Sequence, residues 1–119
     1  MNLLDTDIIL ELLHERRYEI GAISVITLIE ILRGLEDGKR IKVKDLLEKS
    51  FSVQSLNNET IIVYCSLYRR LKKEGVLIPD ADLLIATTAI PRNMTLKTHD
   101  EHFRRLVTFG LKLAKASKK

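Results

Sequence analysis

Tryptophan is absent from this chain of 119 residues, and only three tyrosines and three phenylalanines occur. The core must therefore be built from aliphatic side chains, and an aromatic platform for stacking nucleic-acid bases is not expected. Cysteine occurs once, at Cys65, which excludes a disulfide framework and a zinc site made of paired cysteines. A lone thiol within a helical pattern is typical of a protein that works in a reducing compartment.

Long hydrophobic runs are also missing, and none approaches the roughly 20 residues that a membrane-spanning helix needs. The opening residues, MNLLDTD, lack a basic stretch and reach an acid at the fifth position, unlike a signal peptide. We therefore expect a soluble, cytoplasmic protein with no membrane partner. The sequence also lacks the GxSxG, P-loop and GxGxxG patterns of serine hydrolases and nucleotide-binding folds.

The composition is that of one globular domain, which we expect to span residues 1–119. The chain is 45% hydrophobic and 30% charged, and its net charge is +4 with a pI near 9.3. Positive charge is concentrated at the end, where residues 104–119 hold six cations and no acid. This distribution favours an anionic partner, and a solvated basic tail is an equally good interpretation.

Short apolar runs alternate with stretches of helical periodicity along the chain. The pattern predicts strands at residues 2–5, 20–23, 51–56, 94–98 and 108–113. It predicts helices at residues 6–15, 24–35, 39–49, 57–74, 79–91 and 101–106. Strands separated by helices predict a three-layer α/β/α domain around a central, mostly parallel sheet of four or five strands.

Four acidic residues stand in apolar surroundings. Asp5 ends the first predicted strand, and Asp100 comes two residues after the strand at 94–98. Because the carboxyl ends of parallel strands share one edge, these two acids should lie where the ligand sites of open α/β sheets gather. Glu30 and Asp82 are single acids within apolar helical runs. The four carboxylates can therefore surround one cleft.

Each of these acids also has a purely structural interpretation. The two acids at strand ends fit N-caps of the helices that follow them. Asp82 fits the positive end of a helix dipole, and Glu30 fits an ion pair with Arg33 three residues later. For Asp7 and Asp37 we expect only structural or surface roles of this kind.

A cluster of four carboxylates needs a cation or partial protonation. Two like charges about 4 Å apart repel by about 4 kcal/mol at an effective dielectric constant of about 20. Ligation by oxygen alone favours Mg²⁺ or Mn²⁺, and such a cation can activate water and neutralise a phosphodiester. Asp80 and Asp82 cannot both face one site on a regular helix. We choose Asp82, which continues the apolar face of Ile85 and Ala86, and leave Asp80 as an N-cap or an outer partner of the metal.

Four stretches of this sequence resemble the PIN-domain ribonucleases, in particular the VapC toxins of toxin–antitoxin pairs. They are LLDTDII at 3–9, ISVITLIEILRGL at 23–35, PDADLLIATTAI at 79–90 and LKTHDEHFRRL at 96–106. Their order and approximate spacing match those of the family, and the likeness covers nearly the whole chain. The resemblance implies a single PIN-like nuclease domain that cleaves RNA internally with Mg²⁺ or Mn²⁺ and a metal-activated water.

The resemblance also implies roles for individual side chains. The residues that match the family's acidic quartet are Asp5, Glu30, Asp82 and Asp100. Asp5 and Asp82 would be the principal metal ligands, and the other two acids would complete the pocket directly or through water. Thr98 and Thr6 would donate hydrogen bonds beside the acids.

The expected partners are an RNA substrate, a VapB-type antitoxin that blocks the site, and a second copy of the chain. The antitoxin and the homodimer are implied by the resemblance to the toxins. The basic surround of an acidic cleft suits RNA, because cations hold the backbone while the metal neutralises the cleft. Arg33, Arg104 and Arg105 are candidate contacts to the RNA backbone.

The sequence departs from the family's pattern at His99, where many relatives have Arg or Asn, and in a compact stretch between the second and third acids. These differences concern contact with substrate and the shape of the RNA groove, because no acid of the quartet is missing.

Three other functions are weighed against the toxin. An RNA-maturation nuclease of the same fold is disfavoured by the short chain, which has no room for a substrate-recruiting domain. A receiver-like signalling domain is disfavoured because Thr6 separates Asp5 from Asp7, and because no Asp follows the middle strand. A catalytically idle PIN-like module that binds RNA or protein is the third.

Overall fold

The central sheet has the strand order β3-β2-β1-β4-β5, and its neighbouring strands pair in parallel. The structure is a computed structural model that describes residues 1–115. Its strands are β1 (Asn2–Leu4), β2 (Ala22–Ser24), β3 (Ser52–Gln54), β4 (Thr95–Thr98) and β5 (Lys112–Lys115). From β1 the chain builds β2 and β3 on one side and later adds β4 and β5 on the other. The edge beyond the carboxyl end of β1 is therefore a topological switch point, where open α/β sheets bind ligands.

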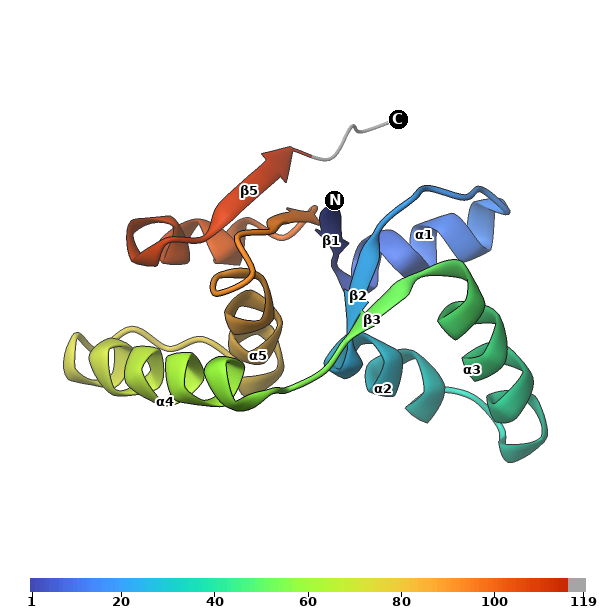
Figure 1. The fold of residues 1–119 in the computed structure, drawn as a ribbon, viewed down its shortest axis with the longest axis horizontal. Coiled ribbons are helices and arrows are strands. Elements are labelled where there is room, and N and C mark those ends of the chain that lie inside the picture. Colours follow the sequence, from blue (N-terminus) through green and yellow to red (C-terminus); the bar gives the residue numbers. More distant parts are fainter. Residues whose placement is uncertain (116–119) are drawn as a thin grey trace.

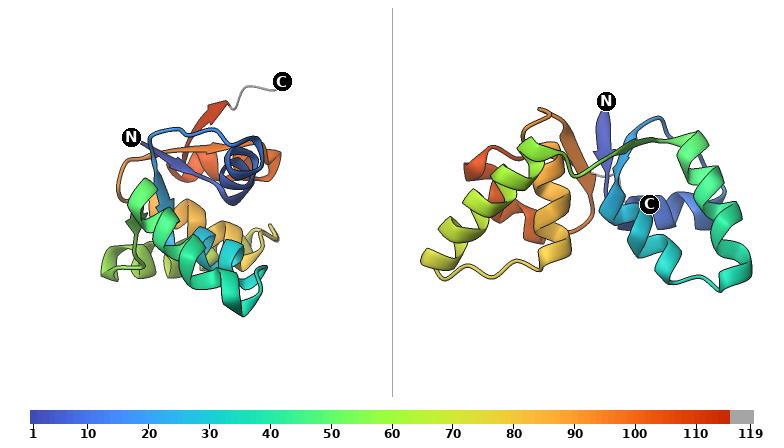
Figure 2. Two further views of the ribbon diagram at one scale, coloured as in Figure 1. Left: turned by 90° about the vertical axis from the view of Figure 1, so that its right-hand side faces the viewer. Right: turned by 60° about the horizontal axis from the view of Figure 1, so that its bottom comes forward.

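Helices cover both faces of this sheet (Figures 1 and 2). They are α1 (Thr6–Glu15), α2 (Val25–Arg33), α3 (Asp37–Ser50), α4 (Asn58–Lys73), α5 (Asp80–Ala89) and the 3₁₀ helix η1 (Glu101–Phe109). In Figure 1, α1 and α3 lie to the right of β1, β2 and β3, and α4 and α5 lie to their left. The prediction of a three-layer α/β/α domain is confirmed, and all five described strands are parallel.

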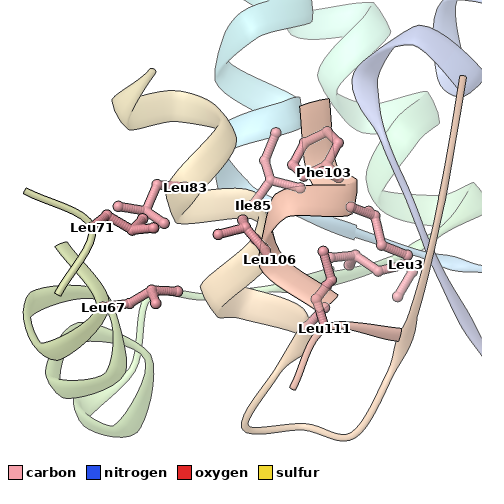
Figure 3. Packing of buried hydrophobic residues seen from close by; sticks show 12 residues of the cluster. Leu3, Leu67, Leu71, Leu83, Ile85, Phe103, Leu106 and Leu111 are labelled. Carbon is pink, nitrogen blue, oxygen red and sulfur yellow. The ribbon is translucent and has the colours of Figure 1, made fainter. Parts of the chain in front are cut away.

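Two aliphatic cores form because consecutive residues of a strand point to opposite faces of a sheet. Leu4 packs with α1, α2 and α3 in one cluster, whereas its neighbour Leu3 packs with α4, α5 and η1 in the other. Figure 3 shows the second cluster, in which Phe103 of η1 is the one aromatic among the fully buried members. This composition agrees with the aliphatic core expected from the scarcity of aromatic residues.

The last two elements differ from the prediction. The helix expected at 101–106 extends as a 3₁₀ helix to Phe109, and the strand expected at 108–113 lies at 112–115 instead. Gly110 is the reason for the shift, because it ends the helix in a left-handed conformation with φ of 102°. Its backbone N–H bonds the carbonyls of Leu106 and Val107, so the preceding residues belong to a helical turn and not to the sheet. Part of the basic tail, residues 116–119, lies outside the described residues.

Arg92 connects three elements that are distant in the sequence. Its guanidinium donates to the side-chain oxygens of Gln54 at 3.1 Å and Thr60 at 2.7 Å. It also donates to the backbone carbonyls of Ser55 at 2.7 Å and Thr88 at 2.9 Å. The end of β3, the first turn of α4 and the last turn of α5 are thereby connected through one side chain.

Substitution of Arg92 by Lys is expected to cost about 2 kcal/mol of unfolding free energy. A single ammonium cannot reach all the acceptors that the planar guanidinium bonds in several directions, so some of the partly buried acceptors lose their donor. Urea denaturation of Arg92→Lys beside Arg69→Lys measures this cost, because Arg69 is exposed on α4. Equal stabilities of the two variants would contradict the role of Arg92.

No helix within residues 1–115 combines the length and the apolar character that crossing a bilayer requires.

Candidate active site

Asp5 lies at the switch point of the sheet, between the end of β1 and the start of α1. Its backbone N–H bonds the carbonyl of Lys97, which continues the pairing of β1 with β4. Its Oδ1 accepts from the Thr6 N–H at 2.8 Å, and its Oδ2 accepts from the Thr98 hydroxyl at 2.7 Å. The residue is only 6% exposed. Asp5 is thus both the N-cap of α1 and a buried carboxylate at the ligand edge.

The pKa of Asp5 is raised from 3.8 to about 7. Burial is the main cause, and the negative charges of Asp7 and Asp82 raise the pKa further. The hydrogen bonds from Thr98 and Thr6 act in the opposite direction, because they stabilise the carboxylate. Asp5 therefore carries a charge that the folded protein, by itself, does not fully compensate.

Thr98 connects Asp5 to Asp100. While its hydroxyl donates to Asp5, its Oγ1 accepts the backbone N–H of Asp100 at 3.0 Å. The Asp100 carboxylate caps η1 by accepting the N–H of His102 at 2.9 Å. Register explains why these residues meet, since Leu4 pairs with Lys97 and each following residue leaves the sheet at the same edge.

Thr6 makes the corresponding connection to Glu30. Its hydroxyl donates to Glu30 Oε1 at 2.7 Å and lies 3.0 Å from the hydroxyl of Thr27. Ser24 caps α2 by accepting the N–H of Thr27, which fixes the start of the helix that carries Glu30. Arg33 reaches Glu30 Oε2 at 3.9 Å, so the ion pair expected from the sequence is present beside the acidic site.

Asp82 completes the group from the first turn of α5. Its pKa is raised, first by burial and then by the negative charges of Asp100, Glu30 and Asp7. The positive charge of His102 acts in the opposite direction. Asp5 is linked to Asp100 through Thr98 and to Glu30 through Thr6. Asp82 adds a further acid whose pKa responds to the charges of Asp100 and Glu30.

Asp80 does not belong to this group. Its Oδ1 accepts a hydrogen bond from the Tyr64 hydroxyl of α4 at 2.7 Å, and the carboxylate raises the pKa of that phenol to about 12. Pro79 is the N-cap residue of α5, so Asp80 does not cap the helix either. That Asp82 and not Asp80 is the acid facing the site stays a prediction.

The three arginines proposed to contact RNA are all exposed, and each makes a protein contact. Arg33 pairs with Glu30 as described above. Arg104 pairs with Glu101 at 2.8 Å, and Arg105 donates to the carbonyl of Leu77 at 3.4 Å. The two ion pairs and the long hydrogen bond of Arg105 are weak contacts of exposed side chains, so they leave the guanidinium groups able to exchange partners.

Asp7 was assigned only a structural role from the sequence, and the structure places it against the acidic site. Its Oδ2 accepts the backbone N–H of His99 at 3.0 Å, and its negative charge raises the pKa values of Asp5 and Asp82. Its Oδ1 is buried and has no hydrogen-bond partner within residues 1–115. The spacing of the LDTD stretch was the available indication, because Asp7 lies in the first turn of the helix that Asp5 caps.

The donor set suits a hard divalent cation. In the described part of the chain, no three Asp, Glu, His or Cys side chains converge as a ready ligand set. Mg²⁺ does not require one, because it keeps several waters and uses one or two carboxylates. The buried Oδ1 of Asp7 and the raised pKa of Asp5 are both features that a nearby cation would relieve.

The chain is therefore a parallel α/β domain with acidic residues at the carboxyl edge of its sheet. The family model of the PIN domain matches residues 3–108, and this chain belongs to that family. The resemblance seen in the four sequence stretches is thereby confirmed. That residues 1–119 form a single domain stays a prediction.

Known proteins similar to the chain include one curated relative and several solved complexes. Ribonuclease VapC1 of Methanocaldococcus jannaschii is 43% identical over 115 residues, which are 93% of this chain and 85% of the relative. The VapBC-1 structure from nontypeable Haemophilus influenzae matches with a TM-score of 0.81 and 27% identity over 96% of each chain. VapBC2 from Rickettsia felis, bound to a DNA fragment from its promoter, matches with a TM-score of 0.75 and 27% identity over 98% of each chain.

Proposed function

We propose that this chain is a divalent-metal-dependent endoribonuclease and the toxin of a VapBC-type toxin–antitoxin pair. The observation that carries the proposal is the gathering of Asp5, Glu30, Asp82 and Asp100 at one edge of the sheet. Burial and mutual repulsion raise the pKa values of two of them. The similarity to a protein named ribonuclease VapC1 supports RNA as the substrate.

The residues divide the work by position. Asp5 and Asp82, the two acids with raised pKa values, would hold Mg²⁺ or Mn²⁺. Glu30 and Asp100 lie beside them and would orient water directly or through a second water. A bound divalent cation would supply activated water and would neutralise the charge that develops on the phosphodiester.

The two threonines hold the carboxylates in place. Thr98 donates to Asp5, and Thr6 donates to Glu30, so neither acid can turn away without breaking a hydrogen bond. Preorganisation of this kind is what catalysis by charge stabilisation requires. The exposed arginines Arg33, Arg104 and Arg105 would bind the RNA backbone.

A VapB-type antitoxin is the proposed protein partner, because the structural relatives at 27% identity are VapBC complexes. An antitoxin that blocks an acidic cleft would present a basic side chain, since a cation satisfies the carboxylates that otherwise hold metal. A homodimer and a cytoplasmic location belong to the same proposal.

The proposal is tested with the purified chain and a set of fluorescent RNAs of mixed sequence. Cleavage is expected with Mg²⁺ or Mn²⁺, should stop in EDTA, and should return when excess Mn²⁺ is added. Cleavage that continues in EDTA would contradict the metal-dependent mechanism. Absence of cleavage under every condition, with the fold verified by circular dichroism, would favour the catalytically idle module.

A further inference from the structure

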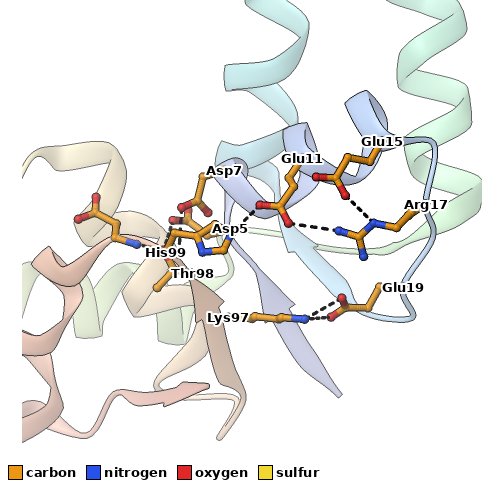
Figure 4. A network of polar contacts seen from close by, with 10 residues as sticks. Asp5, Asp7, Glu11, Glu15, Arg17, Glu19, Lys97, Thr98 and His99 are labelled. Carbon is orange, nitrogen blue, oxygen red and sulfur yellow. Dashed lines mark hydrogen bonds and ion pairs between the residues drawn. The ribbon is translucent and has the colours of Figure 1, made fainter. Parts of the chain in front are cut away.

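His99 stands between two residues of the acidic site. Thr98 before it bonds Asp5, and Asp100 after it belongs to the group of acids. The side chain of His99 is partly buried and contacts α1. Its Nε2 lies 2.6 Å from Glu11 Oε2 on α1, as Figure 4 shows. Because a carboxylate only accepts hydrogen bonds, the imidazole N–H is the donor.

The backbone of the same residue makes a second contact with α1. The His99 N–H donates to Asp7 Oδ2 at 3.0 Å. Asp7 and Glu11 are four residues apart and therefore share one face of α1. The turn that connects β4 to η1 is thus held at two points along this face, one through the main chain and one through the imidazole.

Glu11 is itself fixed. Its Oε1 accepts from Arg17 at 3.2 Å, and Arg17 is held in turn by Glu15 at 2.7 Å. The side chains of His99 and Glu11 are only 27% and 32% exposed, which shields their contact from water more than an ordinary surface pair. A charge-assisted hydrogen bond between partly buried, restrained groups can determine the position of a turn.

We propose that His99 is a positioning residue, which acts through Glu11 to hold the β4–η1 turn against α1 and so determines where the Asp100 carboxylate lies. The inference rests on the proposed function for the meaning of Asp100, and on geometry alone for the contact itself. It assigns a role to the position at which this chain departs from the family's pattern. In this role His99 supports the turn that carries Asp100 and does not itself bind RNA.

Loss of the contact should affect turnover and leave RNA binding unchanged. A displacement of about 1 Å in a residue that orients the reaction can cost up to a hundredfold in rate. Because Thr98 still restrains Asp100, we expect His99→Ala and Glu11→Ala each to lower kcat about tenfold, with KM for RNA unchanged. The double variant should be no slower than the slower single variant, since both changes break one interaction.

The experiment compares four variants with the wild type. They are His99→Ala, Glu11→Ala, the double variant and His99→Gln, whose amide keeps a donor near the position of Nε2. His14→Ala, an exposed histidine near the end of α1, is the matched control. Rescue of kcat by His99→Gln and unchanged kinetics in His14→Ala are expected. Amide hydrogen exchange at residues 99 and 100 should be about tenfold faster in both alanine variants.

Two results would overturn the inference. A rise in KM with kcat unchanged, together with additive losses of kcat/KM in the double variant, would mean that His99 contacts RNA. Unchanged amide exchange at residues 99 and 100 would mean that the contact does not hold the turn. The exchange measurement also separates this inference from the proposed function. If the wild type cleaves no RNA and exchange still accelerates in both variants, the function is wrong and the contact stands.

Discussion

Replacement of Asp5 by Asn is expected to stabilise the folded protein and to abolish RNA cleavage. The pKa of Asp5 is raised from 3.8 to about 7, which corresponds to a destabilisation of about 4 kcal/mol when the side chain is ionised. Asn is neutral and removes this cost. It also loses one acceptor, since Asp5 receives bonds from both Thr6 and Thr98. The expected net gain is therefore about 2 kcal/mol.

The pH dependence gives the prediction its sign. An acid with a raised pKa keeps its proton in the folded state while the unfolded chain releases it. The stability of the wild type therefore falls as the pH rises from 3.8 to about 7 and stays low above that. Asp5→Asn lacks this loss. Relative to the wild type, its stability should therefore change from about 2 kcal/mol lower at pH 4, where only the lost acceptor counts, to about 2 kcal/mol higher at pH 8. Urea denaturation in EDTA at these two pH values measures the change, and a difference that is equal at both would contradict the assignment.

Activity should change in the opposite direction. Without a principal ligand the metal is lost, and we expect cleavage of RNA to fall by about a thousandfold or more. Mn²⁺ should raise the unfolding free energy of the wild type at pH 8 and leave Asp5→Asn unchanged. Asp37→Asn is the matched control, because this acid is 94% exposed on α3 and pairs with Arg40, its one ion-pair partner within residues 1–115. It should alter neither stability nor cleavage by a measurable amount.

The strand-end acids could be predicted because sheet register is a consequence of the apolar pattern. β1 and β4 are buried parallel neighbours, so the residues that follow Leu4 and Leu96–Thr98 must emerge at one edge. Asp5 and Asp100 are therefore linked through Thr98, although they lie 95 positions apart in the sequence. Glu30 was identified by a weaker argument, since an acid in an apolar helical run indicates an unusual environment and does not say which one.

The supporting contacts could not be predicted in the same way. Helical periodicity places Asp7 and Glu11 on one face of α1, but it does not say what that face contacts. Their partner, His99, is 92 and 88 residues away in sequence, and it belongs to a turn whose path depends on the helix after it. That helix was itself predicted too short, because the 3₁₀ turns before Gly110 lack the periodicity of an α-helix.

The neighbouring acids Asp80 and Asp82 allow the sharpest test of the site. Both lie in the first turn of α5, and both would be neutralised by the same chemical change to Asn. The charges of Asp100 and Glu30 raise the pKa of Asp82, whereas the Asp80 carboxylate is bonded to Tyr64 of α4. Cleavage of RNA by Asp82→Asn is expected to fall by about a thousandfold, whereas Asp80→Asn should stay within about twofold of the wild type.

Asp80→Asn should nevertheless have an effect of its own, which verifies that the substitution changes the charge at this position. Its carboxylate accepts a hydrogen bond from the Tyr64 hydroxyl and raises the pKa of that phenol to about 12. Removal of the charge should return the pKa of Tyr64 toward its ordinary value of 10, visible in the ultraviolet titration of tyrosinate. Loss of cleavage in Asp80→Asn with activity retained in Asp82→Asn would reverse the assignment. Loss in both would mean that charge at this end of α5, and not one ligand, supports the reaction.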